Sequence, residues 1–360
     1  LLTSKINLEG PIVKGKTSFN ISARRSYVDL IAKPFMPNDE EYGYYFYDIN
    51  AKINHKFSDR SRIYLSVYNG KDHFAANYDG DTDSKDGSTM NWGNTIVSAR
   101  WNYIFNNRLF SNTTVSYNNY LFDINAYTSN QYALGNDETF TNRYSSDYRS
   151  GINDWNYQID FDYNPSPVHH VKFGTGYIYH RFRPEVMTSK ISDRTDDQTY
   201  RDTTYHNMNN SRIYAHEVSA YAEDNLKISS RLRLNLGLHF SLFHVQKQSY
   251  FSLQPRISAR YQLTDDITLK ASYTKMSQYV HLLSSMPIAM PTDLWVPVTK
   301  EIKPMQSHQY SLGGYYTGIK GWEFSVEGYY KDMRNVLEYK DGVSFFGSST
   351  GWDNKVGMGK

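Results

Sequence analysis

The sequence of 360 residues contains no cysteine, no long apolar run and no excess of charge of one sign. A membrane-spanning helix needs about 20 apolar residues in succession, so a helical membrane protein is excluded. Basic and acidic residues nearly balance, 39 against 37, and the net charge of +2 therefore gives no indication of a nucleic-acid partner. The absence of cysteine fits an exported protein that avoids unpaired thiols.

Aromatic residues, by contrast, are abundant: 33 Tyr, 18 Phe and 6 Trp make up 16% of the chain. Disordered chains carry far fewer aromatic residues, so a folded protein is indicated. The mean hydropathy is -0.67, which leaves two classes, a large soluble β-protein and a β-barrel of an outer membrane. Each tyrosine combines an apolar ring with a polar tip, which suits a wall that is wet on one side.

Apolar and polar residues alternate with a period of two along the chain, the pattern of strands with two different faces. In residues 231–242 (RLRLNLGLHFSL), Leu or Phe occupies every even position, whereas the odd positions carry Arg, Asn, Gly, His and Ser. This pattern predicts an all-β fold of fifteen strands, at residues 1–9, 16–28, 43–57, 61–70, 92–105, 108–122, 152–164, 168–183, 214–228, 231–246, 250–263, 266–278, 305–317, 321–337 and 352–360.

Short and long connections alternate between these strands, apart from a tight turn near Gln248. In an antiparallel sheet, this places short turns at one rim and long loops at the other, as in transmembrane barrels. Soluble sandwiches and propellers show no such asymmetry and have shorter strands, so we predict a transmembrane antiparallel β-barrel. The long extracellular loops are expected at residues 29–42, 71–91, 123–151, 184–213, 279–304 and 338–351.

The predicted number of strands indicates a fragment. An odd number of strands cannot close an antiparallel barrel whose two end strands pair with each other. Residues 352–360 begin a further strand, and the unpaired edges would be an aggregation hazard in a complete molecule. We therefore expect residues 1–360 to form one part of a larger transmembrane barrel.

Six stretches, in this order and spacing, resemble the barrel of TonB-dependent outer-membrane transporters. They are SKINLEGPIVKGKTSFNISARRSYVDLI, HHVKFGTGYIYHRF (169–182), EVSAYAEDNLKIS (217–229), LQPRISARYQLTDDITLKASYTK (253–275), PTDLWVPVTKEIKPMQSHQYSLG (291–313) and FSVEGYYKDMRNVLEYKDG. The resemblance extends over essentially the whole chain. It implies the outer membrane of a Gram-negative cell, a barrel of 22 strands of which about 15 are present, and a plug domain that is not in this chain.

The resemblance also implies active import of a bulky, scarce nutrient, such as a siderophore, corrinoid, haem, oligosaccharide or peptide, driven by a TonB complex. The expected partners are outer-membrane lipid and the TonB complex, and a surface lipoprotein is a further candidate. Two alternatives stay open, a passive porin-like channel and a barrel-anchored surface receptor or adhesin. No GxSxG or Walker sequence occurs, and no GxGxxG follows a strand, so we expect no enzyme activity and no catalytic residues.

Charged residues on the polar strand faces are predicted to line the lumen, because a charge on the lipid side costs about 2–4 kcal/mol near the bilayer midplane. Positive and negative charges are mixed on these faces. We therefore favour a polar network, in which these residues pair with one another and with the plug, over a substrate-binding site. The residues expected to face the lumen or the plug are Arg24, Lys52, Arg100, Asp160, Asp162, Arg231, Arg233, Arg256, Arg260 and Lys270.

Substrate contacts are expected on the long loops. Tyr44 and Tyr45 belong to a rim rich in Tyr and Asn, which suits stacking and hydrogen bonding to a polar ligand. Residues 279–304 are unusually apolar, and they either form an exposed binding patch or fold inward onto the mouth of the barrel. The candidate binding residues in this segment are His281, Met286, Met290 and Trp295.

An acidic segment in the 71–91 loop resembles the first half of a calcium-binding loop. Its candidate ligands are Asp79, Asp81, Asp83 and Asp86. Met90 stands where the bidentate Glu of such a loop is expected, so a solvated acidic turn is the favoured interpretation. We therefore expect no cofactor, and at most weak Ca²⁺ binding.

Overall fold

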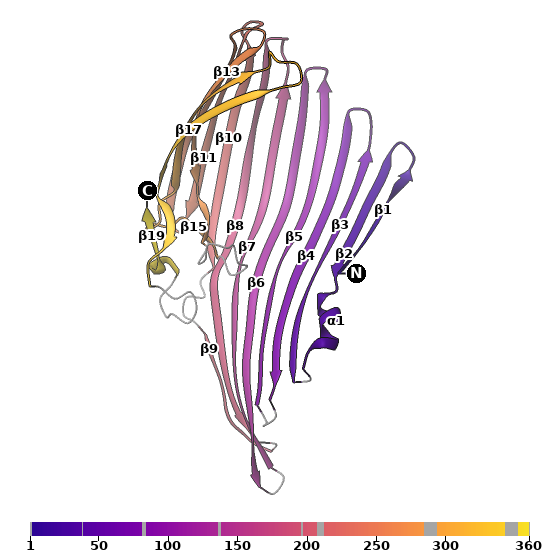
Figure 1. Ribbon diagram of the computed structural model, residues 1–360, viewed down its shortest axis with the longest axis vertical. Helices are drawn as coiled ribbons and strands as arrows, with labels where there is room; N and C mark the ends of the chain where they lie inside the picture. Colours follow the sequence, from indigo (N-terminus) through magenta and orange to yellow (C-terminus); the bar gives the residue numbers. More distant parts are fainter. Residues whose placement is uncertain are drawn as a thin grey trace.

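The computed structural model describes residues 2–37, 39–80, 84–135, 138–195, 197–206, 212–283, 294–342 and 352–359. These residues form almost entirely β-structure, in one curved antiparallel sheet of fifteen strands and two small two-stranded sheets (Figure 1). The few helical segments are three to five residues long. Within the described ranges, no helix is long and apolar enough to cross a membrane.

The strands and short helices follow one another along the chain with few interruptions. Their bounds are β1 (Thr3–Val13), β2 (Thr17–Ser26), α1 (Val28–Ala32), η1 (Lys33–Phe35), β3 (Glu40–Lys56), β4 (Ser61–Asp79), β5 (Ser84–Asn106), β6 (Leu109–Gly135), β7 (Glu138–Tyr163), β8 (His169–Arg194), β9 (Thr199–His206), β10 (Ile213–Lys227), β11 (Leu232–Val245), β12 (Gln248–Gln262), β13 (Ile267–Gln278), β14 (Val280–Leu283), β15 (Leu294–Pro297), β16 (Met305–Tyr316), β17 (Phe324–Arg334), β18 (Val336–Tyr339), η2 (Trp352–Lys355) and β19 (Val356–Gly359).

Strands follow chain order in the main sheet, as the alternating connections predicted, with β9, β14 and β15 left out of the path. The sheet runs from β1 to β8 and continues through β10, β11, β12, β13, β16 and β17, while β9 pairs only with β8. The first fourteen predicted strands all lie in this path. The prediction for residues 352–360 as a wall strand is wrong, because residues 352–359 form η2 and β19, and β19 pairs with β18 apart from the wall.

Three of the predicted long loops are largely strand, so their predicted extents are wrong. The ladders of β4–β5, β6–β7 and β7–β8 continue through most of residues 71–91, 123–151 and 184–194. β6 has 27 residues, although about 9–11 tilted residues suffice to cross a membrane. These hairpins therefore project far beyond one end of the wall, at the bottom of Figure 1.

One connection at the same end is very tight. Gln246 and Lys247 join β11 to β12 and have φ angles of 47° and 67°. Positive φ at both central residues of a two-residue loop is the geometry of a type I′ turn, which matches the twist of the two strands. This turn explains the one short connection among the long ones.

The outer face of the wall carries an apolar band between two rows of aromatic rings. Toward the short turns, Phe161 stacks on Phe173 at 4.9 Å between ring centroids. Toward the long hairpins, Trp155 packs on Tyr117 at 4.8 Å. Trp155 and Phe161 lie six residues apart on β7, about 20 Å along the strand.

The buried core lies on the inner face, at the mouth near the long hairpins. The hairpin β14–β15 packs there against β7 and β8, so the described ends of residues 279–304 fold inward. This is one of the two arrangements that the sequence left open. The apolar side chains of the core are Phe122, Tyr148, Phe182, Ile213, Ala215, Phe243, Val245, Tyr279, Leu283, Leu294, Val296, Val298, Ile302, Trp352 and Val356.

Candidate functional site

The inward-folded hairpin is fixed to the wall by a stack and a short hydrogen-bond chain. Tyr279, just before β14, lies parallel to Phe243 of β11 at 5.0 Å between ring centroids. The Tyr279 hydroxyl is 2.7 Å from Ser241 Oγ, and Gln254 Nε2 donates to the same Ser241 Oγ at 2.9 Å. These contacts place residues 279–283 and 294–302 inside the mouth, where they narrow it.

The candidate binding residues of this segment are in different environments. His281 is only 4% exposed, and its Nε2 atom has no hydrogen-bond partner among the described residues. Burial lowers the pKa of His281 to about 4, so this imidazole is neutral at pH 7 and faces packed side chains. Trp295 lies opposite Leu282 in β15 and is half-buried. Met286 and Met290 lie outside the described residues, so their role in binding stays a prediction.

A groove of about 350 Å³ lies where the long hairpins β4–β5 and β6–β7 extend beyond the wall. Its floor is a row of small residues in direct register, Ala76 opposite Ser88 and Ser88 opposite Ala126. Four tyrosines line it, and three of them are 44–46% exposed. We call this feature the tyrosine groove, and its lining tyrosines are Tyr42, Tyr78, Tyr127 and Tyr144.

Polar groups are also present in the tyrosine groove. Asp86 and Thr128 lie side by side in one row between Tyr78 and Tyr144. The groove therefore combines aromatic faces with a carboxylate and a hydroxyl, the combination typical of sites for polar organic ligands. The alternation along each strand does not identify the row of small residues, which becomes visible only through the strand pairing.

Tyr44 and Tyr45 point to opposite faces, as successive residues of a strand must. Tyr44 donates its hydroxyl hydrogen to Asp72 Oδ1 at 2.7 Å and stacks on Trp92, whose ring centroid is 6.4 Å away. Tyr45 instead packs on His73 at 4.9 Å between ring centroids. The two tyrosines do not belong to one site, and their contact with a substrate stays a prediction.

The predicted lumen-facing residues that belong to strands share one face of the sheet, and half of the predicted set have partners there. Arg24 donates through Nε to Asp48 at 2.6 Å, and Lys52 and Arg100 both lie over the ring of Tyr64. The Tyr221 hydroxyl donates to Asp160 at 2.7 Å, and His170 Nε2 is 2.9 Å from Asp162. These contacts satisfy the charges of this part of the wall within the wall itself.

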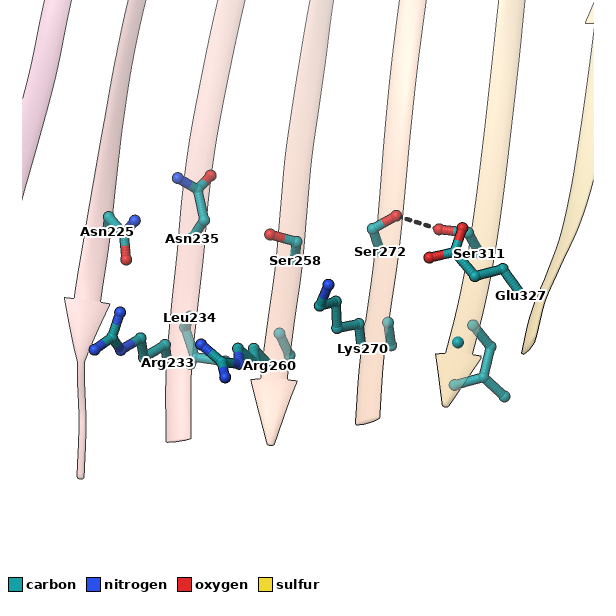
Figure 2. A pocket seen from close by; sticks show the side chains of 14 residues that line it. Asn225, Arg233, Leu234, Asn235, Ser258, Arg260, Lys270, Ser272, Ser311 and Glu327 are labelled. Carbon is teal, nitrogen blue, oxygen red and sulfur yellow. Dashed lines mark hydrogen bonds between the residues drawn. The ribbon is translucent and has the colours of Figure 1, made fainter. Parts of the chain in front are cut away.

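The remaining predicted cations are arranged differently. Arg256 lines a cavity of about 340 Å³ near Glu223, and Arg231 lies just before β11. Arg233, Arg260 and Lys270 line a second cavity of about 360 Å³ on the inner face of β10 to β17 (Figure 2). No carboxylate is paired with these three groups in the part of the chain that the structure describes.

The family model described as "TonB dependent receptor-like, beta-barrel" matches residues 26–357. The chain belongs to the TonB-dependent receptor β-barrel family. It is accordingly part of a multi-pass barrel of the outer membrane, in a family of transporters rather than enzymes. No curated protein matches this receptor chain in sequence.

Solved structures with the same fold include siderophore receptors. The ferric-catecholate import receptor Fiu of E. coli K12 is 11% identical with a TM-score of 0.56, and the match covers 94% of this chain and 57% of Fiu. The ferric yersiniabactin uptake receptor FyuA of Yersinia pestis is 14% identical with a TM-score of 0.53, covering 93% and 53%. PirA of Acinetobacter baumannii is 15% identical with a TM-score of 0.55, covering 94% and 50%. The receptor chain thus spans about half the length of these proteins.

The proposed calcium ligands of the receptor are only partly described. Asp79 ends β4 and pairs with Lys85 Nζ at 3.0 Å, whereas Asp86 lines the tyrosine groove. Asp81 and Asp83 lie outside the described residues. Among the residues that are described, no group of three or more His, Asp or Glu side chains could hold a metal ion. Weak Ca²⁺ binding here stays a prediction, and calorimetry without calcium-dependent heat would remove it.

Proposed function

We propose that this chain is the barrel wall of a receptor that imports a bulky, scarce nutrient of the iron–siderophore class in a TonB-dependent way. The family match over residues 26–357 carries the proposal for import. The names of the similar structures, a ferric-catecholate import receptor and a ferric yersiniabactin uptake receptor, support the choice of substrate class. A plug domain and the TonB complex are part of this proposal, and no residue of this chain carries the coupling.

The tyrosine groove is the proposed first contact for the substrate. It lies on the hairpins that project beyond the membrane-spanning part of the wall, and its aromatic faces are open to solvent. Tyrosine rings suit stacking on planar aromatic or amide groups, and Asp86 and Thr128 can hydrogen bond to polar substituents. A large, polar and partly aromatic ligand is therefore a better fit than a small ion.

Replacing Ser88 with Trp is expected to weaken substrate binding by about tenfold or more, because the indole fills the floor on which the ligand would lie. The matched control is Thr89→Trp, which places the same side chain one residue further along β5, on the opposite face. The measurement is binding of a radiolabelled ferric siderophore to whole cells. Equal binding by both variants and the wild type would contradict the proposal that the substrate lies in the tyrosine groove.

The class of substrate is tested by growth. A strain that lacks the gene is expected to lose growth on at least one ferric siderophore as the sole iron source, and the complementing gene should restore it. Unchanged growth on single iron, corrinoid and glycan sources would overturn the proposal. Uptake that persists without proton-motive force would favour the porin-like alternative, and binding without uptake would favour an adhesin. The hairpin β14–β15 already occupies part of the mouth, which argues against a wide passive pore.

A further inference from the structure

Three arginines lie on the outer face of the wall, just beyond the row of aromatic rings nearest the long hairpins. Tyr179 of β8 belongs to this row, because it is the register partner of Trp155. Arg181 and Arg183 follow Tyr179 on the same face, about 7 Å and 13 Å further along the strand. The register of β10 with β8, continued by one residue, places Arg212 beside Arg183. We call these three residues the outer arginine cluster.

The outer arginine cluster has no counter-charge among the residues that the structure describes. None of its three guanidinium groups forms an ion pair there. Arg25, in the same cross-strand row as Arg183, instead pairs with Asp29 at 2.8 Å. Burial lowers the pKa of the Arg183 guanidinium, and the charges of Arg181 and Arg212 lower it further. A bound anion would therefore stabilise this part of the wall.

Neutral side chains orient the cluster and leave part of it free. Asn153, opposite Arg181 on β7, is only 8% exposed, and its Oδ1 atom accepts from Arg181 Nε at 3.1 Å and Nη2 at 2.8 Å. Asn153 in turn donates to Asn119 of β6. Arg183 Nε is buried and has no hydrogen-bond partner among the described residues. An amide can orient a guanidinium but cannot neutralise it, so donors of the cluster remain available to an anionic ligand.

A belt of uncharged polar side chains leads from the cluster across the outer face. Each is in direct register with the next from β4 to β7, and the last lies opposite Arg181. A groove of about 170 Å³ contains three of them, together with Lys71, which forms no ion pair with a described residue. The carboxylate of Asp123 also lines the groove and accepts a hydrogen bond from Asn91 at 2.9 Å. The residues of the polar belt are Asn69, Thr95, Asn119 and Asn153.

The position of the cluster limits what can occupy it. Long hairpins of outer-membrane barrels lie outside the cell, so the outer face at their base meets the headgroups of the outer leaflet. Material inside the lumen cannot reach this face. Basic clusters at this level bind anionic headgroups, and the guanidinium fork matches two oxygens of one phosphate.

We propose that the outer arginine cluster binds the phosphate groups of a phosphorylated saccharide lipid of the outer leaflet. The polar belt extends four strand spacings from Arg181, about 19 Å, and its amide and hydroxyl groups suit hydrogen bonds to sugar hydroxyls. A glycerophospholipid with a single phosphate would contact only one end of this surface. The exposed rings of Trp155 and Tyr177 lie on the lipid side of the cluster, where they can pack on acyl chains. This inference does not depend on which nutrient the receptor imports.

Native mass spectrometry of the full receptor in detergent tests the proposal, because it resolves the lipid molecules that stay bound. The probe is purified lipid A with two phosphates. Changing both Arg181 and Arg183 to Gln should weaken its binding about tenfold or more, because charge-assisted contacts to phosphate are lost. Arg25→Gln is the matched control on the same outer row, and it should change binding by less than about twofold, because this arginine already has a partner.

Further probes identify the headgroup chemistry without any change to the receptor. Dephosphorylated lipid A should bind the wild type about tenfold more weakly than lipid A, and phosphatidylglycerol should also bind weakly. Equal binding of lipid A with and without phosphate would overturn the proposal. Phosphatidylglycerol that binds as tightly as lipid A, or unchanged binding of lipid A by the double variant, would overturn it too. None of these measurements involves transport, so they stand or fall separately from the proposed import.

Thermal unfolding in vesicles gives an independent test through the sign of the effect. In phosphatidylcholine alone, Arg183→Gln relieves repulsion from Arg181 and Arg212 and should not lower the unfolding temperature. In vesicles that also contain lipid A, the wild type gains stability from the bound lipid, so the same variant should unfold at the lower temperature. A lower temperature for the variant in both kinds of vesicle would show that the receptor supplies its own counter-charge, and would contradict the proposal.

Discussion

Phe243→Ala is expected to lower the free energy of unfolding of the receptor by about 3–5 kcal/mol, the usual cost of truncating a buried aromatic side chain. Phe243 is 0% exposed and lies between the wall and the inward-folded hairpin. Its ring stacks on Tyr279 and lies 5.8 Å from the ring of His180. The substitution would leave a cavity that neither the paired strand β11 nor the fixed hairpin can close.

The matched control is Phe240→Ala, three residues earlier on β11 and on the opposite face. Phe240 is 40% exposed toward lipid, so acyl chains can fill the space that its ring leaves, and we expect a clearly smaller loss. The measurement is urea unfolding in lipid vesicles, followed by tryptophan fluorescence, together with proteolysis of residues 279–304. Equal losses for the two variants, with no new cleavage in the hairpin segment, would show that the mouth core does not hold the hairpin in place.

The wall could be predicted from the sequence because its signal repeats residue by residue. Lipid on one side and a polar lumen on the other impose a period of two, as residues 231–242 show. Short turns then force chain neighbours to pair, so the order of the strands follows from the positions of the connections. Cations that were predicted to face the lumen and belong to strands, such as Arg233 and Arg260, therefore share one face of the sheet.

The projecting hairpins could not be predicted in the same way. Beyond the membrane both faces of a hairpin meet water, so no solvent difference imposes alternation on a stretch such as residues 123–133. The strands β6 and β7 continue there because a paired ladder satisfies the backbone N–H and C=O groups of each further residue. Polar residues on both faces look like a loop in the sequence, although the backbone is fully extended.

The groove floor and the row of cations on neighbouring strands depend on register, which the sequence pattern does not determine. A slip of two residues between β11 and β12 would keep Arg233 and Arg260 on the inner face, but they would no longer lie opposite each other. In the same way, Ala76, Ser88 and Ala126 form a groove floor only because the three strands pair at those positions. Faces can thus be predicted from one strand at a time, whereas a groove or a charged row requires several strands in their correct pairing.

The assignment of faces itself is tested by placing a charge on each side of one strand. Leu65 lies on the outer face of β4, 47% exposed, about five residues from the short turn and thus well inside the apolar band. Leu65→Arg is expected to lower the free energy of unfolding in lipid vesicles by about 2–4 kcal/mol, because the guanidinium must enter hydrocarbon.

Ser66→Arg, on the next residue, points the same charge into the polar lumen, where it lies opposite Lys52. Repulsion between two neighbouring cations costs about 0.2–1 kcal/mol, so this variant should be much less destabilised. Both variants are compared by urea unfolding in vesicles of one lipid composition. A larger loss for Ser66→Arg would show that Ser66, and not Leu65, faces the lipid. It would then place Arg233, Arg260 and Lys270 against lipid, and the inward position of the hairpin β14–β15 would have no explanation.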